Sequence, residues 1–260
     1  MFNYYQSLRN ILRPLYYWFY FRYILILEFI FPPKTKDFYK IPIIINNFNR
    51  LTYLKALIEA LESRGYYNIF IIDNASSYPQ LLDYYKNCKY KIYYLSENLG
   101  HLALWESNLF QYFKKDYYVY TDPDVVPVLE CPSDFMRHFV GCLKKFKFAR
   151  KVGFSLRIDN IPDHYKFKNE VIKWEGQYYN LEINDHLYRA PIDTTFALYR
   201  PRVKGGSNSY VPMYRTKFPY QAEHLPWYVD SNNLTEEEIF YISNSKTSTM
   251  WTQEHSKGDI

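Results

Sequence analysis

The sequence predicts an α/β protein with a mostly parallel central sheet flanked by helices. Short apolar runs rich in β-branched residues alternate along the chain with segments whose apolar residues recur at helical spacing. A polar loop or an acidic residue directly follows three of these runs, after residues 45, 72 and 121. Strands joined by helices lie parallel, so their carboxyl ends gather at one edge of the sheet, which is where such proteins bind ligands.

The composition is that of a globular protein with one main domain and short appendages. The chain has 260 residues, of which 48% are hydrophobic and 23% charged, so it can bury a substantial core. We expect an N-terminal aromatic and basic helical segment over residues 1–38, a main domain over residues 39–245 and a polar tail over residues 246–260.

The charge and the cysteine content limit the classes of partner and the cellular compartment that we expect. The formal net charge of +5 favours an anionic partner such as a nucleotide or a membrane face, but the basic residues are scattered, so we expect no nucleic-acid partner. Cys88, Cys131 and Cys142 form no CxxC motif and cannot all pair within one chain. This pattern indicates a reducing compartment, the cytoplasm, and no zinc site.

The N-terminal segment is apolar and aromatic from Leu15 to Phe31, but Arg22 and Glu28 interrupt it. A membrane-spanning helix needs about 20 uninterrupted apolar residues, and no cleavage pattern of a secretory signal follows. The segment therefore favours an interfacial helix, with Arg9, Arg13 and Arg22 directed toward anionic headgroups at the inner face of the membrane. A helix packed on the body of the protein and a transmembrane anchor are the alternatives.

The alternation of strands and helices can be followed element by element. Residues 41–45 form a short buried strand, and a helix runs from Leu51 to Leu61, with Gly65 as its terminator. The pattern continues with a strand at 69–72, a helix at 78–87, a strand at 92–95, a helix at 102–113 and a strand at 117–121. Near the carboxyl end, residues 235–238 (Thr-Glu-Glu-Glu) have the pattern of a capping box that opens a short helix.

An acid pair, Asp122 and Asp124, closes the last of these apolar runs. Side chains two apart on an extended backbone point the same way, and Pro123 keeps Asp122 extended, so the two carboxylates converge. Convergent carboxylates are typical ligands of a hard divalent cation that also holds phosphate oxygens. A solvated turn is the alternative, but Asp73 and the polar loop after residue 45 fall at the same sheet edge and favour the metal site.

Four segments resemble the nucleotide-sugar glycosyltransferases of the GT-A fold, and the chain is similar to their family 2. These segments are IPIIINNFNR (41–50), IIDNAS (71–76), ENLGH (97–101) and TDPD (121–124). Their order and spacing match over about residues 40–130. The resemblance implies that residues 39–130 form the half that binds the nucleotide-sugar donor and that residues 131–245 form the acceptor half.

The resemblance also implies roles for individual residues. The residues that it places around the donor are Asn47, Asn49, Arg50, Asp73, Asn74, Asn98, Gly100 and Asp122. Asp122 and Asp124 would form the DxD site for Mn²⁺ or Mg²⁺, and Asp73 would bind the base or the ribose. From its sequence position, Arg50 is either a phosphate contact or a solvated residue at a helix start.

The candidates for the catalytic base lie outside the four matched segments. Many inverting relatives carry a Glu-Asp pair as the base, and this chain has no such dipeptide. Asp193, before an apolar run, and Glu223, within Ala222-Glu223-His224, are the candidates. His224 is a candidate third metal ligand. In an inverting reaction, which the resemblance favours, the base removes a proton from the acceptor hydroxyl.

The sequence therefore predicts a metal-dependent hexosyltransferase. Its donor is a nucleotide-diphosphate sugar, and its acceptor is a glycan or a lipid-linked glycan in cell-surface polysaccharide synthesis. A sugar nucleotidyltransferase is an alternative, but it usually has a Gly-rich basic loop after its first strand, which this chain lacks. A non-catalytic nucleotide- or sugar-binding protein is the other alternative.

Overall fold

The structure is a computed structural model that describes residues 2–192, 196–206 and 211–245. The base candidate Asp193 and the tail from residue 246 onward lie outside the described residues. The helices are α1 (Phe2–Ile30), α2 (Thr52–Glu62), α3 (Pro79–Lys86), α4 (Ala103–Glu106), α5 (Phe110–Phe113), α6 (Phe135–Lys145), α7 (Lys168–Gly176) and α8 (Glu236–Asn244). The strands are β1 (Ile43–Asn47), β2 (Ile69–Asp73), β3 (Lys91–Tyr94), β4 (Tyr118–Thr121), β5 (Val125–Pro127), β6 (Lys151–Leu156), β7 (Glu182–Asn184), β8 (Leu187–Arg189), β9 (Ala197–Tyr199) and β10 (Met213–His224).

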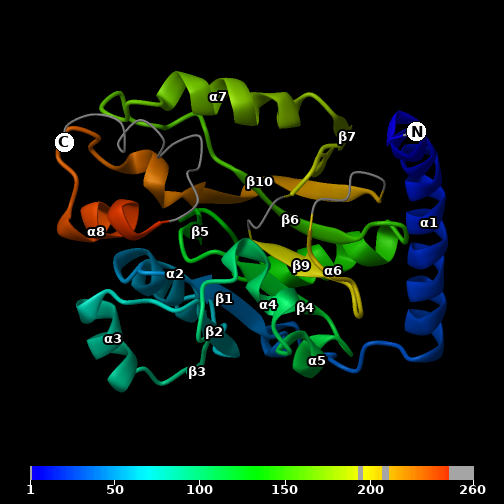
Figure 1. Ribbon diagram of the computed structural model, residues 1–260, viewed down its shortest axis with the longest axis horizontal. Helices are drawn as coiled ribbons and strands as arrows, with labels where there is room; N and C mark the ends of the chain where they lie inside the picture. The colour runs from blue at the N-terminus through cyan, green and yellow to red at the C-terminus, as the bar shows by residue number, and fades with distance from the viewer. Residues whose placement is uncertain (1, 193–195, 207–210, 246–260) are drawn as a thin grey trace.

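The strands of the described residues form one sheet in the order β3-β2-β1-β4-β9-β6-β10-β8-β7, with β5 paired to β10. β1 pairs in parallel with both β2 and β4, placing Asn47 opposite Asp73 and Ile45 opposite Thr121. β9 runs antiparallel to both of its neighbours, β4 and β6. The prediction of a mostly parallel sheet flanked by helices is confirmed, and the carboxyl ends of β1, β2 and β4 meet at one edge (Figure 1).

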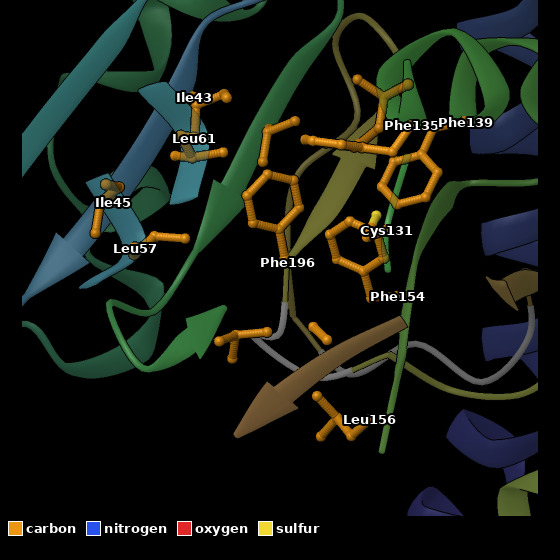
Figure 2. Close-up of a cluster of buried hydrophobic side chains, with 14 of the residues drawn as sticks. Ile43, Ile45, Leu57, Leu61, Cys131, Phe135, Phe139, Phe154, Leu156 and Phe196 are labelled. Carbon is orange, nitrogen blue, oxygen red and sulfur yellow. The ribbon is translucent and has the colours of Figure 1, made fainter. Parts of the chain in front are cut away.

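The two faces of the sheet carry separate hydrophobic clusters because strand side chains alternate. Ile43 and Ile45 point into the larger cluster, which also contains Leu57 and Leu61 of α2 and the buried side of α6. Figure 2 shows this cluster, in which aromatic rings from α6, β6 and the start of β9 lie together. Ile44 points to the other face, where α1, α4 and α5 contribute the second cluster.

One predicted helix is interrupted. Residues 102–113 were expected to form a single helix, but they form α4 and α5 with Ser107 in an extended conformation between them (φ −84°, ψ 168°). The Ser107 hydroxyl accepts a hydrogen bond from the Leu109 N–H at 3.4 Å. Serine competes in this way with the helical hydrogen bonds of the backbone, which explains the break.

The N-terminal helix α1 packs on the body through one side only. Phe21 and Ile24 are buried in the second cluster, and Glu28 pairs with the buried Arg200 at 2.9 Å. Glu28 also accepts a hydrogen bond from the Tyr117 hydroxyl at 3.5 Å. Within the described residues, no helix is long and apolar enough to cross a membrane.

Helix α1 lies at the edge of the sheet opposite the carboxyl ends of β1, β2 and β4. Its partners stand where parallel strands begin: Tyr117 directly precedes β4, and Arg200 donates to the carbonyl of Ala149, just before β6, at 2.6 Å. The chain after α1 is held there too, because Asp116 accepts hydrogen bonds from the N–H groups of Lys34 and Thr35, each at 2.9 Å. Figure 1 shows α1 and α8 at opposite ends of the molecule.

Removal of a ring from the larger cluster tests how tightly it is packed. Phe135 is fully buried, with ring centroids of Tyr66 at 4.6 Å and Phe154 at 5.2 Å. We expect Phe135→Ala to lower the free energy of unfolding in urea by about 3–5 kcal/mol through lost contacts and a cavity. Leu129→Ala, at a position that is 93% exposed, should change it by less than about 0.5 kcal/mol. Equal effects of the two substitutions would contradict the packing described here.

Candidate functional site

Hydrogen bonds join the carboxyl ends of β1 and β2 to each other and to α3. The Asn47 side chain donates to the Tyr85 hydroxyl at 2.8 Å, and the Asn74 N–H donates to the Asn47 carbonyl at 2.8 Å. Sequence reasoning missed Tyr85, which lies on α3 and looks like an ordinary core aromatic. The two strand ends thus form one rigid unit.

Asp73 is the best-buried acid at this edge, with 3% of its surface exposed. Its Oδ2 accepts from the Ser76 N–H at 3.3 Å, whereas Oδ1 is buried and has no hydrogen-bond partner. Burial raises the pKa of Asp73 above its ordinary value, although hydrogen bonds from Ser76 and Tyr85 partly offset this. The free Oδ1 is suited to accept from a nucleobase imide or a ribose hydroxyl.

Gly100 is held against the two strand ends from both sides. Its carbonyl accepts from the side-chain amides of Asn46 at 3.2 Å and Asn74 at 2.9 Å. Asn98 Oδ1 accepts from the Gly100 N–H at 2.8 Å, and Asn74 Oδ1 accepts from the Leu99 N–H at 2.8 Å. Gly100 has φ +67°, a conformation that glycine adopts without strain. Asn74 and Asn98 therefore shape this loop.

Asn49 links the loops that follow β1 and β2. Its backbone is left-handed, with φ 53°, which asparagine tolerates better than most residues. Its Oδ1 accepts from the N–H groups of Ser77 at 2.7 Å and Tyr78 at 2.9 Å, at the start of α3. Its Nδ2 is buried without a hydrogen-bond partner and remains available to a ligand.

Asp124 and His224 meet because β5 pairs with the end of β10, which places Val125 opposite His224. Asp124 Oδ2 lies 3.6 Å from His224 Nε2, and the Asp124 carbonyl accepts from the Leu225 N–H at 2.9 Å. Asp124 Oδ1 is buried without a hydrogen-bond partner. The proximity of the two side chains agrees with the predicted shared role but does not test it.

The His224 imidazole is poised to be neutral. Burial lowers its pKa below the ordinary value of 6.5, and the nearby Asp124 carboxylate only partly offsets this effect. Its Nδ1 has no hydrogen-bond partner, and its ring lies 4.7 Å from the ring of Trp227. Trp227 is 3% exposed, so it supports the imidazole and offers no open face to a sugar. A neutral imidazole can ligate a metal.

Asp122 completes the acidic side of the site. Burial raises the pKa of Tyr241, and the charges of Asp124 and Asp122 raise it further while Arg50 lowers it, so all four groups lie within electrostatic range. No group of three His, Cys, Asp or Glu side chains in the described part of the chain could hold a metal ion alone. Mg²⁺ typically binds one or two carboxylates and takes its other ligands from phosphate and water. The oxygen donors Asp122 and Asp124 fit an ion held in that shared way.

Arg50 is not a solvated residue at a helix start, because only 5% of its surface is exposed. Its Nη1 lies 2.7 Å from Glu238 Oε2 of α8. The guanidinium also lies over the ring of Tyr241 at 3.6 Å and over that of Tyr53 at 5.0 Å. Its Nε has no hydrogen-bond partner, so a phosphate contact remains a prediction.

Helix α8 belongs to the site, which sequence reasoning did not predict. Half of the predicted capping box is present: the Glu238 N–H donates to the Thr235 hydroxyl at 3.2 Å, but the Glu238 carboxylate is directed to Arg50 and Tyr53. Glu237, however, accepts from the Leu51 N–H and the Thr52 hydroxyl at 3.0 and 2.8 Å and so caps α2. Glu238 pairs with Arg50 and accepts from the Tyr53 hydroxyl. Nothing in the local pattern of three glutamates indicates partners so distant in sequence.

The base candidate Glu223 lies apart from the acid pair. Neighbouring side chains on a strand point to opposite faces, so Glu223 and His224 diverge. Glu223 Oε1 accepts from Asn160 Nδ2 at 2.9 Å, and Asn160 Oδ1 accepts from the Tyr228 hydroxyl at 2.6 Å. The structure therefore places Glu223 in a second polar group, and its role as a base stays a prediction.

Comparisons with known proteins show limited similarity. No protein-family model matches the sequence, and no curated protein matches it significantly. Similar solved structures include S. aureus TarS (residues 1–349) and glucosyl-3-phosphoglycerate synthase from Mycobacterium tuberculosis, the latter in complex with Mn²⁺, uridine-diphosphate-glucose and phosphoglyceric acid. Each is 13% identical over 62% of this chain, with a TM-score of 0.37, and the chain spans 47% and 56% of their respective lengths. Likeness at this level carries no information on substrate, and membership of family 2 stays a prediction.

The buried pair of Arg50 and Glu238 gives a prediction about stability. The two side chains are 7% and 10% exposed, so Glu238→Gln leaves a buried guanidinium without its counter-charge. We expect the free energy of unfolding in urea to fall by about 3–5 kcal/mol, and we expect the double variant Arg50→Met/Glu238→Leu to recover most of it. Glu236→Gln, on the exposed side of the same helix turn, is the matched control. A loss no larger than that of the control would show that the pair is unimportant.

Burial of His224 gives a prediction about pH. Because the folded pKa lies below 6.5, the unfolded state takes up the proton first as the pH falls. Stability should therefore be constant above about pH 6.5 and should decrease below it, as far as the depressed folded pKa. His224→Gln should flatten this decrease in urea titrations between neutral pH and about pH 5, whereas substitution of the exposed His164 by Gln should leave it unchanged. An unaltered slope in His224→Gln would argue against a buried neutral imidazole.

Proposed function

We propose that the protein is a metal-dependent glycosyltransferase of the hexosyltransferase type. It moves a sugar from a nucleotide-diphosphate sugar to a glycan or lipid-linked glycan acceptor, in cell-surface polysaccharide synthesis. The observation that carries the proposal is a set of unpaired buried polar atoms at one sheet edge. These atoms are Asn46 Oδ1, Asn47 Oδ1, Asn49 Nδ2, Asp73 Oδ1 and Asp124 Oδ1.

Such a set is unusual in a folded protein, because an unpaired buried polar group costs about 1–3 kcal/mol. These atoms come from the ends of β1, β2 and β4, which the parallel pairing holds at one edge. A nucleoside offers both donors and acceptors of hydrogen bonds and would satisfy the atoms on the face that Asn47 shares with Asp73, whereas Asn46 points to the other face. We therefore assign the base or ribose to Asp73 and the asparagines, and the diphosphate to the side of Asp122 and Asp124.

The acid pair, Asp122 and Asp124, holds the metal ion that helps the nucleotide diphosphate to leave. Mn²⁺ or Mg²⁺, when bound, supplies positive charge that stabilises the diphosphate oxygens. Asp122 and Asp124 would hold it from the protein side together with phosphate and water, and His224, next to Asp124, is the proposed further ligand. Arg50 contributes its free Nε, while its net charge is already balanced by Glu238.

The acceptor half supplies the base in this proposal. In an inverting displacement the acceptor oxygen forms a bond to the anomeric carbon as the bond to the diphosphate oxygen breaks, and a carboxylate takes the hydroxyl proton. Asp193 and Glu223 are the proposed carboxylates. Glu223 has Asn160 as an orienting partner, which holds one of its oxygens and leaves the other for a proton.

Two other functions use the same site differently. A sugar nucleotidyltransferase would join a sugar 1-phosphate to a nucleoside triphosphate and release pyrophosphate. A non-catalytic nucleotide- or sugar-binding protein would bind the donor without releasing nucleotide diphosphate. Cys88, Cys131 and Cys142 are free thiols, in agreement with the cytoplasmic location that we propose for all three functions.

A panel of nucleotide-diphosphate sugars with Mn²⁺ or Mg²⁺ tests the proposal, with release of nucleotide diphosphate as the measurement. We expect one donor to be turned over. We expect Asp122→Asn and Asp124→Asn each to lower that rate by about 10²–10³-fold, because charge on the leaving group loses its stabilisation. Asp83→Asn, on the exposed side of α3, is the control and should leave the rate unchanged.

Two results would defeat this function. Pyrophosphate release from a nucleoside triphosphate and a sugar 1-phosphate, without donor turnover, would identify a nucleotidyltransferase. Donor binding that survives in the Asp122→Asn and Asp124→Asn variants, with no turnover in any of the proteins, would identify a binding protein.

A further inference from the structure

The outer side of α1 is a continuous apolar surface with no covering element in the described residues. Phe21 and Ile24 face the body of the protein, and the side chains on the opposite side recur at spacings of three and four, which places them on one face. Each of them is more than half exposed, up to 63% at Phe19. They are Leu12, Leu15, Phe19, Tyr23, Ile26 and Ile30.

From residue 12 onward, the charged side chains that α1 exposes have one sign. Arg13 and Arg22 are exposed on the helix. The only acid between residues 12 and 36 is Glu28, and its carboxylate is turned inward, pairs with Arg200 and is 14% exposed. Folding therefore removes the one negative charge of this segment from the surface and leaves the positive charges outside.

The surface extends from α1 onto the end of α6. The Arg22 guanidinium lies 4.8 Å from the ring of Trp18 and 4.4 Å from the ring of Phe148, which is 47% exposed. Three exposed lysines stand just before this phenylalanine. They are Lys144, Lys145 and Lys147. The apolar face of α1 thus has a basic rim contributed by a second element.

We propose that this surface docks on an anionic lipid bilayer, with α1 lying in the plane of the interface. A basic rim around exposed aromatic and aliphatic side chains complements both the headgroups and the acyl boundary of such a membrane. A second copy of the chain is a poorer occupant, because a two-fold contact would bring like-charged rims together. The proposal does not depend on the function proposed for the candidate site, because α1 lies at the opposite edge of the sheet from the carboxyl ends of β1, β2 and β4.

Sedimentation of the purified full-length chain with lipid vesicles tests the docking surface. We expect binding to vesicles of phosphatidylcholine with phosphatidylglycerol, and at least about tenfold weaker binding to phosphatidylcholine alone, because several basic side chains each add attraction near an anionic surface. Phe19→Glu/Ile26→Glu should lower binding to the anionic vesicles by at least about tenfold through loss of the apolar contact. Tyr67→Glu/Leu129→Glu, at positions that are 60% and 93% exposed elsewhere, is the matched control and should bind as the wild type does.

A second measurement locates the contact. Bromine-labelled acyl chains should quench the fluorescence of wild-type protein, and Trp18→Phe should remove most of that quenching. Equal binding of the Phe19→Glu/Ile26→Glu variant and the wild type would overturn the proposal. So would a wild-type protein that ignores anionic vesicles, or one that forms a dimer in solution which the same double substitution separates.

Discussion

Parallel pairing of β1 with β2 and β4 is the constraint on which the rest of the structure depends. It sets Asn47 beside Asp73 and Ile45 beside Thr121, so three separate loops leave the sheet at one edge. The same register sorts the isoleucines of β1 between the two hydrophobic clusters. A slip by one residue would exchange the two faces and move Asp73 away from its partners, so packing and site geometry are specified together.

Helix α8, the last described helix, is part of the candidate site because it supports the loop after β1. Glu237 caps the start of α2, and Glu238 balances Arg50, which leaves α2 and the loop after β1 dependent on a segment 185 residues away. Because these acids are held by buried and partly buried hydrogen bonds, the loop that carries Asn49 and Arg50 is positioned before a ligand arrives. Preorganisation of this kind lowers the entropy lost on binding.

Local patterns were sufficient for the first four strands of the sheet, but they did not predict the later strands or their antiparallel pairing. Apolar runs of four or five residues located β1, β2 and β4, and Asp73 and Asp124 could be assigned to their carboxyl ends without a structure. The break at Ser107 escaped notice because the helical pattern of apolar residues continues across it. The roles of Glu238 and Tyr85 could not be predicted because they depend on partners that only the folded chain brings near. The identity of the catalytic base could not be predicted for a similar reason. Whether a carboxylate can act as a base depends on the groups that the fold places around it.

Because α1 and the acid pair lie at opposite edges of the sheet, docking through α1 would set the distance between the bilayer and the candidate site. A protein that rests on a bilayer through α1 holds the acid pair away from the surface, because β6 begins beside Arg200, the partner of α1, and runs for six residues, about 20 Å, toward the other edge. The site would then act at a fixed height above the headgroups. A site held at that height meets groups that project from the bilayer, and not the headgroups themselves.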